Sequence, residues 1–226
     1  MPELPEMENY RQLLEQVIKN KVITQIEINR EKSINVKPSY FNNRVLHSQV
    51  VKIERRAKHL LFHLNHNHVL LLHLMLGGWI FFGKEKERPD RTIQVRLSFG
   101  EQHLYFIGLR LGYLHLYSTQ EAEQALSGLG PEPLTESFTL PLFLKLIKKR
   151  RGSLKNKLVD QSFISGIGNC YSDEICYHAK LLPMRRLEDL NQNEKVELFH
   201  AIRYVLPDAL RQGGYMDQPL FKGDKK

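Results

Sequence analysis

The stretch Leu129-Gly130-Pro131-Glu132-Pro133-Leu134 separates two parts of the chain that have different apolar patterns. Two prolines and a glycine in so short a stretch interrupt regular structure, so we place a domain boundary at this point. Before it, short β-rich runs alternate with polar turns, whereas beyond it apolar residues recur at helical spacing. The sequence therefore predicts an α+β chain, with one domain over residues 1–130 and a helical domain over residues 131–226.

The N-terminal part is predicted to be a helix followed by a β-sandwich or barrel-like assembly. The apolar residues of segment 6–18 share one helical face, and the turn residues of segment 33–43 indicate a loop or a strand connection. Strands are predicted over 22–28, 50–53, 60–64, 69–76, 79–82, 92–99, 103–107 and 114–117. In the second part, helices are predicted over 138–149, 155–160, 169–179 and 193–210, followed by a polar loop.

The composition is that of a globular protein with an excess of basic residues, because 42% of the 226 residues are hydrophobic and the formal net charge is +8. No apolar run approaches the roughly 18 residues of a spanning helix, and no secretory signal opens the chain, so we expect a cytoplasmic protein without a membrane partner. Cys170 and Cys176 do not point the same way on one helix, so neither a disulfide framework nor a metal site follows. The positive charge favours a polyanionic partner. The alternative is a basic protein that has this net charge without binding a polyanion.

The first six residues, Met1-Pro2-Glu3-Leu4-Pro5-Glu6, contain two prolines and two glutamates. If Met1 is removed, Pro2 carries a secondary amine that can attack an aldehyde and form an iminium, as Schiff-base lysines do. An α-amino group titrates at about 7.7–8.0, so part of it is unprotonated near neutral pH, and Glu3 is placed to move protons. The alternative is a tail that ends at Pro5, the first turn of a helix, with Glu6 at its positive end.

Two basic clusters and one small-residue turn are suited to phosphate groups. The cluster Arg55, Arg56 and Lys58 precedes an apolar strand, where Lys58 is alternatively an ordinary edge-strand lysine. The turn 165–169 leads into a helix whose first N–H groups suit a phosphate, and Asn169 either caps that helix or contacts the phosphate. The densest basic run can bind phosphates or form a solvated helix face, and consists of Lys145, Lys148, Lys149, Arg150, Arg151, Lys155 and Lys157.

Taken together, these stretches resemble the formamidopyrimidine-DNA glycosylase and endonuclease VIII family, from Met1 to about Gly214. The resemblance implies a β-sandwich domain followed by a helical DNA-binding domain with a helix-two-turn-helix motif and a lesion-covering loop. Its sharpest parts occur in family order and are Pro2-Glu3-Leu4-Pro5-Glu6, Arg55-Arg56-Ala57-Lys58, the 129–134 stretch, and Leu158-Val159-Asp160-Gln161 through Gly166-Ile167-Gly168-Asn169-Cys170-Tyr171-Ser172-Asp173-Glu174.

The resemblance implies a bifunctional DNA glycosylase and abasic-site lyase that removes damaged bases, oxidised ones in particular, from double-stranded DNA. Such enzymes flip the damaged nucleotide out of the duplex. In the family's mechanism, the Pro2 amine attacks C1′ of the sugar, Glu3 supplies acid/base catalysis and Glu6 supports the site. Lys58 matches the family lysine that assists elimination and contacts phosphate. No cofactor is needed, because the amine itself acts as the electron sink.

Four further residues match family positions that bind the phosphate backbone or the lesion, namely Arg110, Arg150, Lys155 and Asn169. At the position of Arg150 the family more often has lysine, which keeps the charge. The resemblance also implies a monomer that works at the nucleoid.

The chain departs from the family pattern in three places. The positions that fill the gap left by the flipped nucleotide read Leu76, Leu109 and Leu111, where the formamidopyrimidine branch has Met, Arg and Phe. A leucine can still wedge between bases, but we expect weaker discrimination of the opposite base. The family histidine near the segment 88–91 is absent. The family's zinc ribbon is also missing from this chain, which ends inside the expected lesion-covering loop, and two lone cysteines cannot supply four zinc ligands.

The main alternative is a non-catalytic or altered-specificity protein that binds damaged DNA. The leucines at the wedge positions and the missing ribbon favour it, whereas the presence of Pro2, Glu3 and Lys58 counts against it. A third hypothesis is a lineage that excises other bases, such as alkylated ones.

Overall fold

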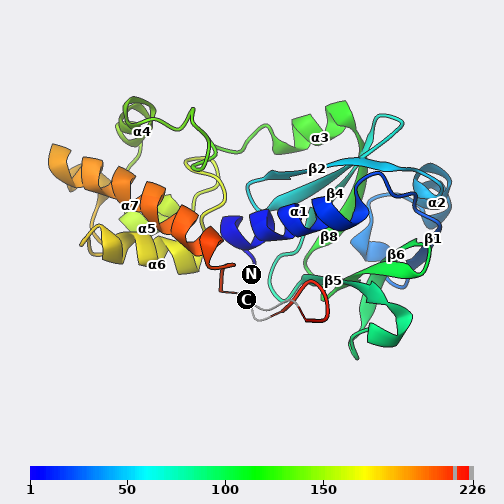
Figure 1. Ribbon diagram of the computed structural model, residues 1–226. Helices are drawn as coiled ribbons and strands as arrows, with labels where there is room; N and C mark the ends of the chain where they lie inside the picture. Colours follow the sequence, from blue (N-terminus) through cyan, green and yellow to red (C-terminus); the bar gives the residue numbers. More distant parts are fainter. Residues whose placement is uncertain (216–217, 224–226) are drawn as a thin grey trace. The chain divides into compact units, whose positions relative to one another are not determined.

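The computed structural model describes residues 1–215 and 218–223, and contacts between residues divide the chain into two compact units (Figure 1). Unit 1 consists of Met1–Pro2, Glu6–Leu126 and the C-terminal stretch from Tyr215. Unit 2 consists of Glu3–Pro5 and Ser127–Gly214. The first helix, α1 (Leu4–Ile18), therefore begins in unit 2 and continues in unit 1.

Unit 1 is built on two four-stranded antiparallel sheets. One sheet has the order β1 (Gln25–Ile28), β6 (Ile93–Phe99), β7 (Gln102–Ile107) and β5 (Trp79–Lys84). The other has the order β2 (Val50–Arg56), β3 (His59–Leu64), β4 (His68–His73) and β8 (Tyr113–Ser118). The predicted helix followed by a β-sandwich is confirmed, with element ends shifted by a few residues.

Both sheets and α1 contribute to one apolar core in unit 1. Alternate residues of a strand point to opposite faces of a sheet, and Leu60 and Phe62 of β3 are buried in this core together with Leu70 and Leu72 of β4. From α1, the core receives Met7, Tyr10, Leu14 and Ile18, whose spacing of three or four places them on one helical face. Fully burying one such side chain stabilises the fold by about 1.5–3 kcal/mol.

Two short helices of unit 1 were not anticipated from the sequence. The expectation of a loop or strand connection over 33–43 is wrong, because α2 (Pro38–Val45) begins within it and buries Phe41 and Val45. Pro38 stands at the first turn of α2, where its missing N–H has no helical partner to lose. The second helix, α3 (Thr119–Leu126), buries Ala122 and Leu126. Helices of this length carry too few periodic residues to be distinguished from a turn.

Unit 2 is helical, as predicted, and its core lies among α4 (Leu140–Ile147), α5 (Leu154–Leu158), α6 (Asn169–His178) and α7 (Gln192–Arg211). The long helix α7 begins with a capping box, in which the Asn191 side chain and Glu194 bond each other's backbone N–H groups. The short helix α5, the turns over 161–168 and α6 follow one another as a helix-two-turn-helix arrangement.

The expected lesion-covering loop includes Met216, Asp217 and residues 224–226, which lie outside the described residues. Within the described ranges, none of the helices combines the length and the apolar character that crossing a bilayer requires.

Candidate active site

Pro2 is buried and lies in the wall of a cavity of about 260 Å³ in unit 1. The other residues that line this cavity are Met1, Gly77, Gly78, Trp79, Arg91 and Gln218. Among the described residues that line the cavity, Arg91 has a charged side chain and none is a carboxylate. A nitrogen nucleophile at position 2 would therefore react in a cavity whose lining residues include an arginine and a tryptophan.

The carboxylate of Glu6 holds the C-terminal stretch against the beginning of the chain in unit 1. Glu6 is only 2% exposed, and its Oε1 accepts a hydrogen bond from the Tyr215 backbone N–H at 3.1 Å. The hydroxyl of Tyr215 donates to the Met1 carbonyl oxygen at 2.5 Å. Glu6 and Tyr215 therefore link the segment around Pro2 to the chain that follows the last helix.

Glu3 is bound at the beginning of α6, within unit 2. Its carboxylate accepts hydrogen bonds from the Gly168 N–H at 2.5 Å and from the Cys170 N–H at 3.0 Å. These donors stand at the N-terminal end of a helix, where unpaired N–H groups and the helix dipole favour a negative charge. The helix start that the sequence suggested for a phosphate is thus engaged by Glu3, and Asn169 stands exposed as its first helical residue.

The turn before α6 is shaped to receive residues 3–5. The Gln161 side chain closes this turn, donating to the Val159 and Ile167 carbonyl oxygens and accepting from the Gly166 N–H. Leu4 N–H donates to the Gly166 carbonyl oxygen at 3.0 Å. Gly166 has φ +95°, and a β-carbon there would lie 2.7 Å from the Leu4 side chain, so glycine is required by both conformation and space.

Lys58 lies in the tight turn that joins β2 to β3, and its side chain is buried, with 6% of the residue exposed. The preceding residue, Ala57, has φ +53°, which directs the chain through the turn. The strand before the turn is joined to α1 by the Arg55–Glu8 ion pair at 2.9 Å, and both side chains of this pair are largely buried. Lys58 therefore lies in a hairpin that an ion pair joins to α1. Its burial distinguishes it from an ordinary edge-strand lysine, which is exposed.

Two histidine rings lie near Lys58 on the neighbouring strands. His59 and His73 have ring centroids 4.4 Å apart, and His59 Nε2 lies 3.2 Å from the Tyr113 hydroxyl. Burial, with the nearby His73, lowers the pKa of His59 to about 3. Burial and the positive charge of Lys58 lower the pKa of His73 to about 4. Both rings are therefore neutral near neutral pH.

The three wedge leucines are not equivalent in the structure. Leu76 is 68% exposed and Leu111 is 64% exposed, whereas Leu109 has no exposed surface and belongs to the core of unit 1. The loops that carry Leu76 and Leu111 adjoin each other, because a β-carbon at Gly108 would lie 2.1 Å from the Gly77 carbonyl oxygen. Of the three leucines predicted to form the wedge, Leu76 and Leu111 are exposed and Leu109 is not.

The backbone of Leu109 and Arg110 is fixed by polar side chains. The Leu109 N–H donates to Gln94 Oε1 at 3.1 Å, and Gln94 is buried. Arg30 donates to the carbonyl oxygens of Leu109 and Arg110 at 3.4 and 3.3 Å. The side chain of Arg110 is exposed and is available to an incoming ligand. Sequence patterns do not reveal this tether, because its members come from distant segments.

Two of the predicted phosphate-binding cations of unit 2, Arg150 and Lys155, have carboxylate partners. The Arg150 guanidinium contacts Asp160 at 3.4 Å and donates to the Ser162 carbonyl oxygen at 3.0 Å. Lys155 Nζ lies 2.6 Å from Asp173, joining α5 to α6. The Arg150 and Lys155 side chains are each about 30% exposed, so solvent reaches both ion pairs.

Zinc does not fit the residues that the structure describes, since residues 1–215 and 218–223 contain no cluster of three or more His, Cys, Asp or Glu suited to a metal ion. Cys170 and Cys176 form no disulfide in the described part of the chain, and burial raises the pKa of Cys176 to about 11.

Family models match both parts of the chain. The formamidopyrimidine-DNA glycosylase N-terminal domain matches residues 1–113, and the H2TH domain of the same family matches residues 129–218. Formamidopyrimidine-DNA glycosylase of Listeria monocytogenes serotype 4b is 34% identical over 221 residues, covering 95% of this chain and 80% of that protein. The Carboxydothermus hydrogenoformans protein of the same name is 36% identical over 216 residues, covering 95% and 79% of the two chains.

Solved structures of Lactococcus lactis Fpg have the same fold. Its complex with DNA containing N7-benzyl-Fapy-dG superposes with a TM-score of 0.92 at 26% identity, covering 100% of this chain and 85% of that chain. Its complex with DNA containing an abasic site has a TM-score of 0.90 at 26% identity, covering 96% and 81% of the two chains. From the matched family models and the Listeria relative, we conclude that the chain belongs to the formamidopyrimidine-DNA glycosylase family.

Proposed function

We propose that this protein is a DNA glycosylase that removes damaged bases, oxidised ones in particular, and then nicks the strand as an abasic-site lyase. The observation that carries the proposal is the position of Pro2 in the wall of a cavity of about 260 Å³. Once Met1 is removed, this residue has a secondary amine. The likeness to Lactococcus lactis Fpg, which was solved with DNA containing an abasic site, supports DNA as the partner.

In the proposed reaction, the lone pair of the Pro2 amine forms a bond to C1′ while the bond from C1′ to the base breaks, and the base departs with a proton. The Pro2 nitrogen then loses its proton, and its lone pair expels O4′, which takes up a proton, so the sugar ring opens and an iminium forms. This iminium withdraws electrons and acidifies the hydrogen on C2′. Loss of that proton with rupture of the C3′–O bond is the β-elimination that nicks the strand. The iminium is the electron sink, so this chemistry uses no cofactor.

Glu3, the residue after the nucleophile, is proposed to move protons at the sugar. Its two backbone donors, Gly168 and Cys170, restrict the carboxylate to one place, which supports a role in oriented acid/base catalysis. Glu6 supports the site through its bond to Tyr215. Lys58 is proposed to contact phosphate and to assist elimination.

Cations and exposed leucines are proposed to hold the DNA. Arg110, Arg150, Lys155 and Asn169 contact backbone phosphates, and the ion pairs of Arg150 and Lys155 open or share their charge when DNA binds. Leu76 and Leu111 fill the space of the everted nucleotide, because they are the exposed members of the predicted wedge. We propose a catalytic domain over residues 1–130, which also contributes DNA contacts, and a helical DNA-binding domain over residues 131–226, and we expect a monomer that works at the nucleoid.

The test is borohydride trapping with DNA that contains an abasic site. Borohydride reduces an iminium to a stable amine, so the wild-type protein is expected to form a covalent adduct, and mass spectrometry is expected to locate it at Pro2 after loss of Met1. Pro2→Gly is expected to lower the yield of adduct strongly, with Pro38→Ala as a control for loss of a proline elsewhere. Absence of a wild-type adduct, or an adduct that is unchanged by Pro2→Gly, contradicts the proposal.

A second candidate function is that of a protein that binds damaged DNA without cutting it. The leucines at the predicted wedge positions favour this alternative. This alternative predicts tight binding to duplexes containing a lesion and no strand nick. Both readouts come from the same incubations, analysed by electrophoresis with and without denaturation.

A further inference from the structure

The Tyr215 hydroxyl bonds an oxygen that belongs to the peptide bond between Met1 and Pro2. Tyr215 Oη donates to the Met1 carbonyl oxygen at 2.5 Å. Standard bond lengths place the oxygen of a peptide bond about 2.2 Å from its nitrogen. The Tyr215 hydroxyl oxygen therefore lies within about 4.7 Å of the Pro2 nitrogen.

Removal of Met1 takes away the acceptor that the Tyr215 hydroxyl bonds. The Pro2 nitrogen is bonded directly to the carbonyl carbon that departs, so the new amine stands beside the space that the carbonyl group leaves. A tyrosine hydroxyl both donates and accepts hydrogen bonds. It can therefore bond the amine directly or through one water in that space, and both arrangements are within the reach of groups that assist a reaction.

The chain that carries Tyr215 is fixed within unit 1 by contacts that do not involve Met1. The Tyr215 N–H donates to Glu6 Oε1 at 3.1 Å, and Glu6 is 2% exposed. Further along, the Phe82 N–H of β5 donates to the Leu220 carbonyl oxygen at 2.6 Å, and the Leu220 side chain is buried in the core of unit 1. Neither anchor uses the Tyr215 ring, so both remain when Met1 is lost.

The amine of a terminal proline reacts best when one side of its nitrogen is occupied. The nitrogen carries one hydrogen and one lone pair, which exchange places by inversion, and attack on C1′ requires the lone pair to face the sugar. An oxygen that accepts from the N–H fixes the hydrogen on one side and leaves the lone pair on the other. Such orientation of a reacting group lowers the barrier. The hydroxyl hydrogen then turns to water, because Tyr215 is 41% exposed.

We propose that Tyr215 is a positioning residue for the nucleophile. Once Met1 is removed, its hydroxyl oxygen accepts a hydrogen bond from the Pro2 N–H, directly or through one water, and the nitrogen lone pair is left available to C1′. This inference rests on the proposed role of Pro2 and adds the group that orients it. Base release and cleavage of an abasic site both begin at this nitrogen, so the hydroxyl serves both reactions.

The test is Tyr215→Phe, which removes the hydroxyl and keeps both the ring and the backbone N–H that bonds Glu6. Nicking of a preformed abasic site is measured in single turnovers with the protein in excess, between about pH 6 and 9, on either side of the range in which an α-amino group titrates. The limiting rate is expected to fall about three- to tenfold, the usual worth of one hydrogen bond. The protein concentration that gives half of this rate is expected to stay within about twofold of the wild-type value, because the hydroxyl does not bind DNA in this role.

The pH profile of the rate reports on the amine itself. The hydroxyl oxygen bonds the protonated amine more strongly than the neutral amine, because charge-assisted hydrogen bonds are the stronger kind. The midpoint of the profile is therefore expected to move to lower pH in Tyr215→Phe, by about 0.5–1 unit. The charged groups described beside this contact, Glu6 and Arg91, remain in the variant, so such a shift belongs to the hydroxyl.

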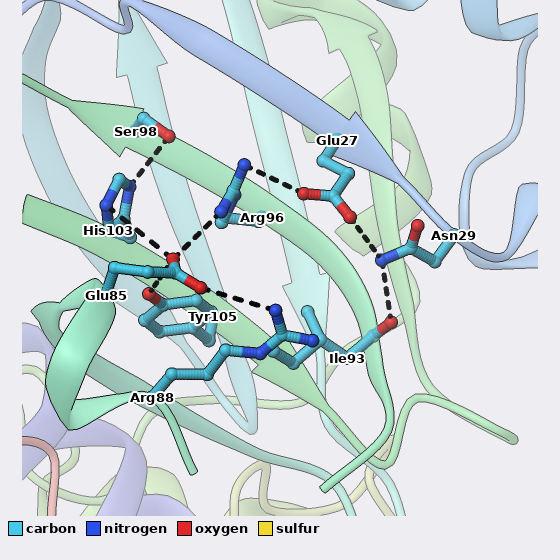
Figure 2. A network of polar contacts seen from close by, with 9 residues as sticks. All are labelled: Glu27, Asn29, Glu85, Arg88, Ile93, Arg96, Ser98, His103 and Tyr105. Atoms are coloured by element: carbon cyan, nitrogen blue, oxygen red, sulfur yellow. Dashed lines mark hydrogen bonds and ion pairs between the residues drawn. The ribbon is translucent and has the colours of Figure 1, made fainter. Parts of the chain in front are cut away.

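Tyr105→Phe is the matched control, because it removes a tyrosine hydroxyl that belongs to another network. Figure 2 shows this hydroxyl bound to Glu85 at 3.0 Å, and Glu85 also accepts from Arg96 at 3.0 Å and from Arg88 at 3.4 Å. The two arginines keep the turn before β6 anchored when the hydroxyl is lost. Tyr105→Phe is expected to nick at the wild-type rate, with an unmoved midpoint.

Each outcome decides the inference. Mass spectrometry confirms that every variant lacks Met1, since a nitrogen that is blocked by Met1 cannot react, and thermal melting reports on folding. An unchanged rate and midpoint in Tyr215→Phe overturn the inference. A lower rate with an unmoved midpoint assigns Tyr215 a structural role and overturns it as well.

The proposed function and the role of Tyr215 fail in different ways. If the wild-type protein forms no borohydride adduct with abasic DNA, the proposed function itself fails. If the adduct forms and Tyr215→Phe behaves as wild type, only the positioning role of Tyr215 fails.

Discussion

The first six residues and the two loops that carry Leu76 and Leu111 are fixed by different means. At the N-terminus, Glu3 and Glu6 are each 2% exposed and their carboxylates are bound by backbone N–H groups. In the loops, the leucine side chains are exposed and the order comes from the backbone, through the close approach at Gly108. The glutamates proposed for the active site are thus held through their side chains, whereas the loops expected to meet DNA are held through their backbone.

This difference has a consequence for mutations. A change in the N-terminal segment removes a buried partner and affects both folding and chemistry, because unpaired buried polar groups are costly. A change at an exposed loop leucine leaves the backbone in place and is expected to affect only what the loop touches. Leu109 does not follow this rule for loop leucines, since its chain neighbours lie on the loop while its side chain lies in the core.

The largest effect is expected for Glu3→Gln. The amide keeps the shape of the side chain but cannot take up a proton, so base release is expected to fall by about 10²- to 10⁴-fold. The free energy of unfolding should fall by about 1–3 kcal/mol, because the amide NH2 cannot accept from one of the two backbone N–H groups and the charge at the helix N-terminus is lost. Single-turnover base release and urea unfolding measure the two quantities, with the exposed Glu123→Gln as the control. Retention of activity would show that Glu3 is a structural anchor alone.

The wedge leucines allow the sharpest test of the comparison. Leu109→Ala is expected to lower the free energy of unfolding by about 2–5 kcal/mol, because it opens a cavity in the core. Leu76→Ala and Leu111→Ala should each change it by less than about 0.5 kcal/mol. The same two variants are expected to slow base release from duplex DNA. Urea unfolding of all three variants checks the ranking, and equal losses of stability would contradict the assigned burial.

Gly166→Val tests the contact between the N-terminal segment and the turn before α6. The new β-carbon would meet Leu4 at 2.7 Å, and a branched residue is strained at φ +95°. Overpacking of this kind costs about 1–3 kcal/mol of stability, and displacement of Leu4 should also slow base release. Gly128→Ala is the matched control in the same unit, because a β-carbon there meets nothing within 4 Å. A Gly166→Val protein of unchanged stability and activity would show that this contact is not needed.

The last prediction is a dependence of stability on pH that His59 and His73 cause and that leaves base release at neutral pH unaffected. Their folded-state pKa values, about 3 and about 4, lie below the ordinary 6.5, so the unfolded chain takes up protons first. Their contribution is complete above pH 6.5 and is lost as pH falls toward these lower values, at up to about 1.4 kcal/mol per pH unit for each ring. Unfolding of wild type and His73→Phe at pH 7 and 4.5 should give a smaller difference for the variant. An equal difference would contradict the assigned burial.

Much of the fold follows from local pattern, and the exceptions have physical causes. Strands and long helices repeat apolar residues often enough to be recognised, whereas α2 and α3 are too short for a repeat. The sequence analysis did not place Trp79 and Arg91 in the site, because Trp79 carries no local signal and the segment 88–91 was noted only for its missing family histidine. The one available signal was that Trp79 is the only tryptophan. Their meeting at Pro2 depends on the pairing of β5 with β7 and on the anchored turn before β6.

The sequence by itself determined the two-part α+β plan, the basic character and the amine at position 2, because apolar periodicity, charge and terminal chemistry are properties of the chain alone. Only the tertiary structure decided what surrounds that amine. Glu3 finds its donor at Gly168, 165 positions further along the chain, and Leu109 is buried while Leu111 is exposed. Such choices depend on which distant backbones come together, and residue types and spacing do not contain that information.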